Sequence, residues 1–287
     1  MTIKLVTDST CDLPEALLKR YDVTIVPISI QFGEKSYLEN VTIHPDTFYD
    51  TVLHGGIFPK TSQPSVGEFL TVYKKLAAEN PGAEILSVHI SAKLSGTHQS
   101  ATLAAKQAAD VVKVHVIDSM AGSAGLGWMM ADAGELVAQG KTPAQIRAIL
   151  EAKREQIVIF LALDNLKFAQ LSGRVSKLAG FVSSVLNIKP IVGLTAGSLA
   201  ANHRARNVDN ALKKIVALTA EKIGQKPVNI SAIHALNPTR ARKLLDMAKA
   251  RLNVADAFVD DLSISVAGHL GPGTVGLVTY PVTDYTQ

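Results

Sequence analysis

Hydrophobic positions in the first half of the chain fall into short β-branched runs separated by amphipathic stretches. The runs predict strands, and the stretches with apolar residues three or four positions apart predict helices. Strands that alternate with helices are typical of a largely parallel sheet with covering helices. The expected strands are 3–8, 23–32, 84–90 and 112–118, and the expected helices are 14–21, 65–79, 97–110, 123–140 and 142–155, the last capped by Thr142 with Pro143 in its first turn.

The pattern changes from Ile157 onward. A strand over 157–163 is followed by two helical segments, and "IKPIVGLTAGSLAANHRAR" indicates two strands joined at "TAGS", a β-hairpin. Further on we expect helix 208–223, strand 228–235, a helix opening at Asn237 and Pro238, and closing segments 257–262 and 273–280. We therefore predict a two-domain α/β fold: an N-terminal domain (1–155) with helices on both faces of a mostly parallel sheet, and a C-terminal α/β domain (156–287) with a mixed sheet.

The composition adds constraints on size and compartment. Hydrophobic residues make up 47% of the chain and charged residues 19%, which supplies a sizeable apolar interior. The single cysteine, Cys11, excludes an intramolecular disulfide and favours a reducing cytoplasm. The start of the chain lacks the apolar core of a signal peptide and reads as a strand entering a helix. The longest stretch without Asp, Glu, Lys or Arg, 262–283, could span a bilayer by length, but its His269, "GPG" and many Ser and Thr residues favour loop and strand.

Two glycine motifs resemble nucleotide-binding loops without fitting them. "GPGTVG" (271–276) precedes an expected strand, whereas a dinucleotide fingerprint follows a strand and opens a helix. "GSAGLG" (122–127) does open a helix but lacks the lysine of a phosphate loop. We interpret the second motif as close packing of a helix.

Candidate catalytic and metal-binding residues are dispersed. The histidines form no HxH or HExxH pattern, so a metal site has little support, and His89 and His115 lie in apolar strands as expected core residues. His269 lies in "AGHLGPG", which we expect to be a loop, either structural or in contact with a ligand. Asp8 and Asp118 end expected strands, where helix capping and catalysis are both open roles.

Charge is distributed unevenly along the chain. The formal net charge is only +4, yet the window from 165 to 208 contains no Asp or Glu. This window favours an anionic partner over a merely solvated basic face. Nucleic acid is the weaker choice, because Phe168 and Phe181 are the only aromatic rings available there for base stacking. The six basic residues of the window are Lys167, Arg174, Lys177, Lys189, Arg204 and Arg206.

The stretch "ISAKLSGTHQSA" (90–101) concentrates hydroxyl side chains around one glycine. A nucleophile, a phosphate loop and an anion clamp are three possible interpretations. The stretch has no G-x-S-x-G elbow and no phosphate-loop lysine, which favours the anion clamp. Ser95 and Thr97 would supply hydroxyls, Gly96 would permit close backbone approach, and the following helix would supply N-terminal amides.

Seven stretches together resemble the DegV family of bacterial lipid-binding proteins, in family order and across essentially the whole chain. They are "VTDSTCDLP" (6–14), "TSQPSVGEF" (61–69), "SAKLSGTHQSA" (91–101), "VIDSMAGSAGLG" (116–127), "LSGRVSK" (171–177), "IKPIVG" (188–193) and "HLGPGTVG" (269–276). Cys11 stands where the family usually has a small residue, which we interpret as tolerated packing.

The resemblance implies a carrier that buries one long-chain fatty acid and presents its carboxylate to a separate fatty acid kinase, which forms an acyl phosphate for phospholipid synthesis. It implies a ligand between the domains, no cofactor, no stable membrane insertion and no catalysis by the chain itself. The implied carboxylate-binding residues are Thr61, Ser95, Gly96, Arg174 and His269. Arg204 and Arg206 match positions that face the kinase or its phosphate.

Two other function classes remain open at this point. One is a small-molecule enzyme that uses Asp8, Ser95 and His269 on a carboxylated or phosphorylated substrate. The other is a nucleic-acid-binding protein that uses the 165–208 window. Acyl chain length and oligomeric state do not follow from the sequence.

Overall fold

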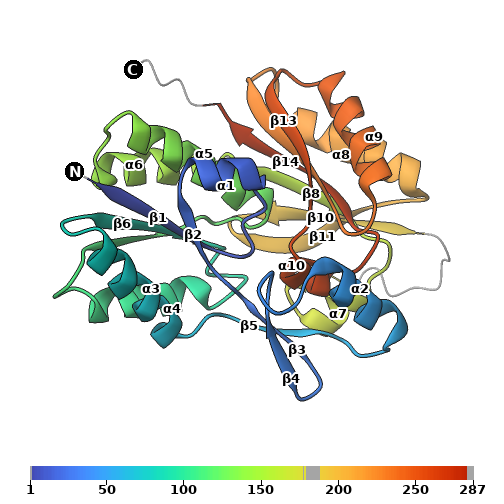
Figure 1. Cartoon of the computed structure of the whole chain (residues 1–287). Helices are drawn as coiled ribbons and strands as arrows, with labels where there is room; N and C mark the ends of the chain where they lie inside the picture. The colour runs from blue at the N-terminus through green and yellow to red at the C-terminus, as the bar shows by residue number, and fades with distance from the viewer. Residues whose placement is uncertain (1, 177, 179–187, 283–287) are drawn as a thin grey trace. The chain divides into compact units, whose positions relative to one another are not determined.

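The computed structural model describes residues 2–176, 178 and 188–282. The described chain forms two compact units, of which the first ends at Glu155 and the second begins at Gln156. Each unit has its own sheet and helices (Figure 1). The α/β fold class predicted from the sequence is therefore confirmed.

The first unit is built on a four-stranded parallel sheet with the order β2-β1-β6-β7. Its strands are β1 (Ile3–Asp8), β2 (Val23–Val26), β6 (Glu84–His89) and β7 (Val114–Asp118). Helices cover both faces, with α3 and α4 on one side and α5 and α6 on the other (Figure 1). These helices and the short α1 are α1 (Glu15–Arg20), α3 (Val66–Glu79), α4 (Thr97–Gln107), α5 (Ala124–Ala138) and α6 (Pro143–Arg154).

The helix starts follow local sequence signals. The Ser65 side chain accepts a hydrogen bond from the Glu68 amide, and Glu68 bonds back to Ser65, which is a capping box. Thr142 and Gln145 form the same arrangement at α6, as the sequence predicts for Thr142. The glycines of α5 allow close packing, since a Cβ on Gly127 would lie 2.2 Å from the Asp12 carbonyl oxygen. The packing interpretation of "GSAGLG" is confirmed.

The single strand expected over 23–32 is wrong. Strand β2 ends at Val26, Pro27 follows without an amide hydrogen, and β3 belongs to a separate three-stranded antiparallel sheet, β4-β3-β5. Helix α2 lies between β4 and β5, in a stretch for which the sequence pattern predicts no element. The bounds are β3 (Ser29–Phe32), β4 (Lys35–Leu38), α2 (Pro45–His54) and β5 (Lys60–Ser62).

The second unit contains a seven-stranded mixed sheet with the order β13-β12-β14-β8-β10-β11-β9. The expected hairpin is confirmed: β10 and β11 are antiparallel, and Ala196 and Gly197, both with positive φ, form the two-residue turn. The strands are β8 (Val158–Ala162), β9 (Val175–Ser176), β10 (Lys189–Thr195), β11 (Ser198–Ala205), β12 (Val228–His234), β13 (Val254–Asp261) and β14 (Val275–Pro281).

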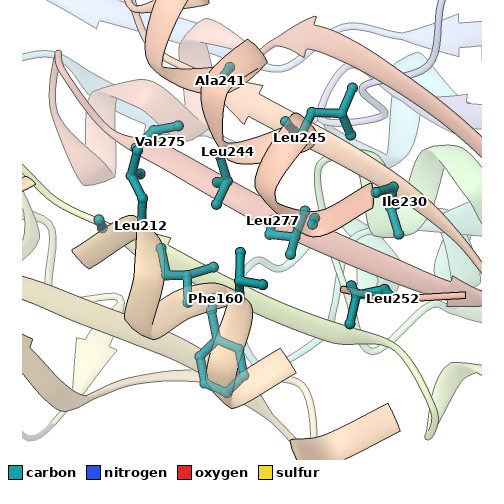
Figure 2. Close-up of a cluster of buried hydrophobic side chains, with 14 of the residues drawn as sticks. Phe160, Leu212, Ile230, Ala241, Leu244, Leu245, Leu252, Val275 and Leu277 are labelled. Carbon is teal, nitrogen blue, oxygen red and sulfur yellow. The ribbon is translucent and has the colours of Figure 1, made fainter. Parts of the chain in front are cut away.

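The core of the second unit lies between this sheet and helices α8 (Val208–Ile223) and α9 (Pro238–Lys249). Figure 2 shows Leu244 of α9 and Leu277 of β14 among the buried side chains of this cluster. Leu244 and Leu277 are fully buried, so truncating either to alanine is expected to destabilise the unit by about 2–5 kcal/mol.

The described residues of the second unit also form two short helices, α7 (Lys167–Ser172) and α10 (Ile264–Leu270). The second helical segment expected before residue 188 falls on 177 and 179–187, outside the described residues. The loop expected around His269 is wrong, because 264–270 forms α10. Burial of Ile264, Ala267 and Leu270, spaced by three residues, stabilises this short helix where local propensity is weak.

Among the described residues, no helix has both the length and the apolar character needed to cross a membrane. The segment expected as loop and strand over 262–283 contains α10 and β14. As expected, "GPGTVG" precedes a strand, and Gly271 and Gly273 both adopt positive φ.

Candidate functional site

The Ser95 loop connects the end of β6 to the first turn of α4. Its turn is fixed by backbone hydrogen bonds from the Leu94 and Ser95 amides to the Ser91 carbonyl oxygen. The Ser95 and Thr97 hydroxyl oxygens are 2.8 Å apart, and the Thr97 amide donates to Ser95 Oγ at 3.3 Å. Gly96 occupies the N-cap position without a side chain. Hydroxyls and helix N-terminal amides therefore gather at one point, which can accept an anion.

Thr61 lies on β5 of the first unit, two residues before Gln63. It is half-buried and pairs with Ile30 of β3. Two residues further on, Gln63 packs against Gly96: a Cβ at Gly96 would lie 2.9 Å from Gln63 Nε2. The structure therefore brings the segment of Thr61 and the Ser95 loop together within the first unit, where the end of the Gln63 side chain occupies the space beside Gly96.

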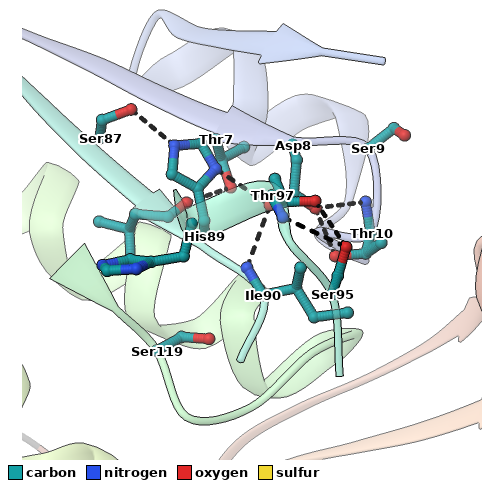
Figure 3. Close-up of polar contacts among 12 residues, drawn as sticks. Thr7, Asp8, Ser9, Thr10, Ser87, His89, Ile90, Ser95, Thr97 and Ser119 are labelled. Carbon is teal, nitrogen blue, oxygen red and sulfur yellow. Dashed lines mark hydrogen bonds and ion pairs between the residues drawn. The ribbon is translucent and has the colours of Figure 1, made fainter. Parts of the chain in front are cut away.

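A buried polar network lies beneath the Ser95 loop (Figure 3). Asp8 is fully buried and accepts hydrogen bonds from the Thr10 hydroxyl, the Thr10 amide at 3.1 Å and the Ile90 amide at 3.0 Å. His89 Nδ1 lies 3.0 Å from the same carboxylate, and its Nε2 lies 2.7 Å from Ser87 Oγ. The Asp8 network therefore ties the end of β1 to the end of β6.

These contacts test the helix-cap role expected for Asp8. Burial alone raises the pKa of Asp8, but the hydrogen bond and charge of His89 and the bonds from Thr10 and Ile90 hold this pKa below its ordinary value. Asp8 caps the loops after β1 and β6, so the helix-cap role is wrong. Asp118 is likewise a loop cap, since its carboxylate accepts from the Met120 amide at 2.8 Å and the Ala92 amide at 3.3 Å.

The two strand histidines differ in burial. His89 is fully buried and has a partner at each ring nitrogen, which confirms the expectation of a satisfied core residue. His115 is half-buried and pairs with Glu84. Among the described residues, no cluster of three or more His, Cys, Asp or Glu side chains could hold a metal ion. Cys11 is buried.

Arg174 and His269 lie close together in the second unit, where α7 and α10 pack against each other (Figure 1). The Ser172 hydroxyl donates to the His269 carbonyl oxygen at 3.3 Å, and the Arg174 guanidinium donates to the Ser172 carbonyl oxygen at 2.6 Å. Burial and, second, the positive charge of Arg174 lower the pKa of His269 to about 4. At neutral pH this pair therefore combines one fixed positive charge with a neutral imidazole.

The turn after α10 holds the His269 segment against α7. A Cβ on Gly271 would lie 2.7 Å from the Phe168 ring, and one on Gly273 would lie 2.8 Å from the Asp164 carboxylate. Both glycines also have positive φ, so other residues would be strained there. The glycines of "HLGPG" thus fix the position of His269.

The described basic residues of the acid-free window differ in their surroundings. Lys189 Nζ pairs with Asp164 at 2.7 Å, one residue before the window begins. Arg204 and Arg206 are exposed at the end of β11 and just beyond it. Lys177 lies outside the described residues.

The expected carboxylate-binding residues thus fall into two groups. In the first unit, the segment of Thr61 meets Ser95 and Gly96 through Gln63, and in the second unit Arg174 and His269 are neighbours. Gln63 and Ser172, which link the members of each group, do not stand out in the sequence pattern. Their only sequence signal is membership of the stretches "TSQPS" and "LSGR".

Comparisons with known proteins cover nearly the whole chain. The chain is 31% identical to a DegV domain-containing protein of Clostridium acetobutylicum over 97% of this chain and 98% of that protein. It is 28% identical to the protein DegV of Bacillus subtilis over 96% and 98% of the two chains.

Solved structures give the same result. A structure described as "Fatty Acid Binding of a DegV family Protein from Thermus thermophilus" matches with a TM-score of 0.90 and 34% identity, over 98% of this chain and 100% of that one. The structure of DegV from Bacillus subtilis, described as a fatty acid binding protein, matches with a TM-score of 0.87 and 27% identity, over 98% and 100%.

The family model described as "Uncharacterised protein, DegV family" matches residues 2–282. This match takes in both units and every motif from which the resemblance was drawn. The chain belongs to the DegV family.

Proposed function

We propose that the protein binds one long-chain fatty acid, buries the acyl chain and presents the carboxylate to a separate fatty acid kinase. The observation that carries this proposal is the match over 98% of the chain, at 34% identity, to a DegV family protein described by its fatty acid binding. Similarity over both units makes a shared ligand class the simplest explanation. The remaining argument concerns which groups hold the ligand.

The carboxylate is proposed to bind Thr61, Ser95 and Gly96 together with Arg174 and His269. A carboxylate that leaves water needs charge-assisted hydrogen bonds. The first group supplies hydroxyls and helix amides, and Arg174 supplies the positive charge. Because the pKa of His269 is lowered to about 4, its imidazole acts as a neutral hydrogen-bonding group at physiological pH.

The acyl chain supplies most of the affinity in this proposal. Burial of about fourteen methylenes at about 0.8 kcal/mol each gives on the order of 10 kcal/mol before association costs. The polar groups then select the carboxylate over other headgroups. No cofactor is needed for this role.

The proposed role of the protein is that of a cytoplasmic carrier rather than an enzyme. The acceptor oxygen belongs to the lipid, and the kinase brings the nucleotide and metal. Arg204 and Arg206, both exposed, are proposed to face the kinase or its phosphate. Charge reversal at either arginine should impair lipid phosphorylation while leaving lipid binding intact. Loss of lipid binding would instead assign these residues to the pocket.

The contacts of Asp8 do not favour the enzyme alternative. Its carboxylate accepts bonds from Thr10 and Ile90 and contacts His89, all in the interior, whereas the hydroxyl of Ser95 contacts Thr97. A general base must reach the proton that it abstracts. Turnover of a small carboxylated or phosphorylated substrate without a kinase would reverse this conclusion.

Mass spectrometry of lipid extracted from the purified protein tests the proposal. We expect close to one long-chain fatty acid per chain, and reduced occupancy in Arg174→Ala but not in Lys74→Ala, a matched change at an exposed position. A purified protein that contains no fatty acid and takes none up from vesicles would contradict it.

A further inference from the structure

A groove runs along the open edge of the parallel sheet in the first unit. Strand β7 is the last strand of the order β2-β1-β6-β7 and pairs only with β6 among the described strands. The groove encloses about 570 Å³ beside β7 and α4, with Arg147 of α6 contributing to its wall. We call it the β7 groove and define it by His98, Lys106, Lys113, Val114, Val116 and Arg147. None of these residues belongs to the proposed carboxylate site.

The backbone of β7 offers hydrogen-bonding groups to this groove. The Lys113 carbonyl accepts from the Ile85 amide, and the Ser119 amide donates to the His89 carbonyl, so both residues face β6. Alternation along a parallel strand turns the amides and carbonyls of Val114 and Val116 the other way, toward the open edge. The Asp118 carbonyl follows the same alternation and accepts from the Arg154 guanidinium at 2.8 Å. Val114 and Val116 can therefore pair with an added strand.

The side chains of the groove combine an apolar floor with positive charge. Val112, Val114 and Val116 line it with one alanine of α4 and one just beyond the end of that helix. Its charged residues are Lys106, Lys113 and Arg147, with no Asp or Glu in the lining. Lys113 pairs with Glu84 at 3.4 Å and Arg147 with Glu151 at 3.1 Å. Both pairs are partly exposed, so they contribute little and can exchange for other carboxylates. Lys106 makes no ion pair with any described residue.

Prevention of unwanted strand pairing at β7 would explain the lysines of the groove but not its volume or its valines. Lysines on an edge strand discourage unwanted pairing. Preventing such pairing does not require a hollow of this size with valines on its floor. A hollow of this kind leaves room for the alternate side chains of another strand. A second copy of this chain is a poor occupant, because edge-to-edge pairing of β7 with itself would bring the same lysines together.

We propose that the β7 groove docks an extended acidic segment of a partner protein, which adds to the sheet as a strand beside β7. Main-chain bonds at Val114 and Val116 supply affinity, small apolar side chains of the segment fill the hollow, and its carboxylates contact Lys106, Lys113 and Arg147. The inference does not depend on the lipid ligand, since no residue of the groove is assigned to lipid binding.

Binding of a synthetic peptide of alternating Glu and Val residues to the full chain tests this proposal. A peptide of alternating Lys and Val residues is the control. We expect the acidic peptide to bind and to slow amide hydrogen exchange at Val114 and Val116. Lys106→Glu combined with Lys113→Glu should weaken binding by at least about tenfold, because two charge contacts become repulsive. Lys74→Glu with Lys75→Glu on α3 should leave binding unchanged.

A second variant separates strand addition from simple charge attraction. Val116→Pro removes an amide that faces the groove and leaves the bonds to β6 in place, so peptide binding should be lost while the circular dichroism spectrum is retained. Peptide binding without slowed exchange at Val114 and Val116 would overturn strand addition. If the acidic peptide does not bind, the proposal is wrong and the lysines serve only to prevent unwanted pairing at the sheet edge. Self-association of the chain that is abolished by the Lys106 and Lys113 reversals would make a second copy the occupant and overturn the proposal.

Discussion

The two units supply unlike chemistry to the proposed carboxylate site. In the first unit, the Ser95 loop offers uncharged hydroxyls and amides above the Asp8 network, which is buried. In the second unit, Arg174 is exposed and donates to the Ser172 carbonyl beside His269. Under the proposed function, the first unit would orient the carboxylate by hydrogen bonds and the second would supply the positive charge. Variants should therefore affect stability on one side and ligand affinity on the other.

The largest expected effect comes from removing the foundation of the Ser95 loop. Asp8→Ala leaves His89 and the Thr10 and Ile90 amides without their shared acceptor in a fully buried site. We expect a loss of about 3–5 kcal/mol in the free energy of unfolding. Urea unfolding followed by fluorescence of Trp128, the only tryptophan and a residue of the first unit, measures it.

The matched control for Asp8 is Asp50→Ala, which removes an exposed carboxylate paired with exposed His54. This control should change the free energy of unfolding by no more than about 1 kcal/mol. Equal destabilisation by the two variants would show that the Asp8 network does not support the first unit.

The second largest effect is a pH dependence of folding stability that arises from His269. Because folding lowers its pKa from 6.5 to about 4, the unfolded state binds a proton more readily. His269 therefore costs no stability above pH 6.5, and stability falls as the pH drops from 6.5 to 4, by roughly 3 kcal/mol.

Urea unfolding at a series of pH values, in the wild type and His269→Gln, measures this term. The variant should lose less stability over the acid range. The same comparison removes the contributions of His98, His203 and His234, whose pKa values burial also lowers. Identical pH profiles would mean that His269 is protonated equally in both states.

The third effect tests the charge assigned to the second unit. Arg174→Ala should weaken fatty acid binding by roughly 10- to 100-fold, because a charged hydrogen bond contributes about 1.5–3 kcal/mol. Arg174→Lys should fall between the wild type and the alanine variant. Titration with a fluorescent fatty acid gives the affinities, and Arg206→Ala, at another exposed arginine, should match the wild type. Unchanged affinity in Arg174→Ala would remove Arg174 from the site.

The smallest effect belongs to the hydroxyls. Ser95→Ala and Thr61→Ala should each weaken fatty acid binding by roughly fivefold, because an uncharged hydrogen bond contributes about 1 kcal/mol. Neither should change the stability measured by Trp128 fluorescence. Ser36→Ala, at an exposed serine of β4, is the matched control for affinity. If Ser95→Ala weakens fatty acid binding as much as Arg174→Ala does, the two units do not divide hydrogen bonding and charge between them as proposed.

Local signals predicted those parts of the fold that depend on local interactions. The caps at Thr142 and Asn237 and the turn at Ala196 and Gly197 follow from side chains adjacent in sequence. The strand expected across Pro27 is wrong because apolar alternation continues on both sides of the proline and hides the interruption. Helix α10 was missed because packing of Ile264 and Leu270 stabilises it, and packing partners distant in sequence leave no periodic signal.

The candidate site, like the fold, could be predicted from the sequence only in part. The sequence identified the hydroxyls beside Gly96 as a candidate anion site, and the resemblance supplied Thr61, Arg174 and His269. The sequence did not indicate that Asp8 bonds to Ile90, because that contact joins two strand ends 82 positions apart. It also gave no sign of Gln63 packing against Gly96, which depends on where β5 lies in the fold.

A crystal structure of the protein with a bound sixteen-carbon fatty acid tests the central claim most directly. The account predicts one lipid per chain, with carboxylate oxygens about 3 Å from hydroxyls of Ser95 and Thr61 and from the Arg174 guanidinium. A carboxylate bound away from both groups of residues, or a lipid whose headgroup contacts only the β7 groove, would contradict it.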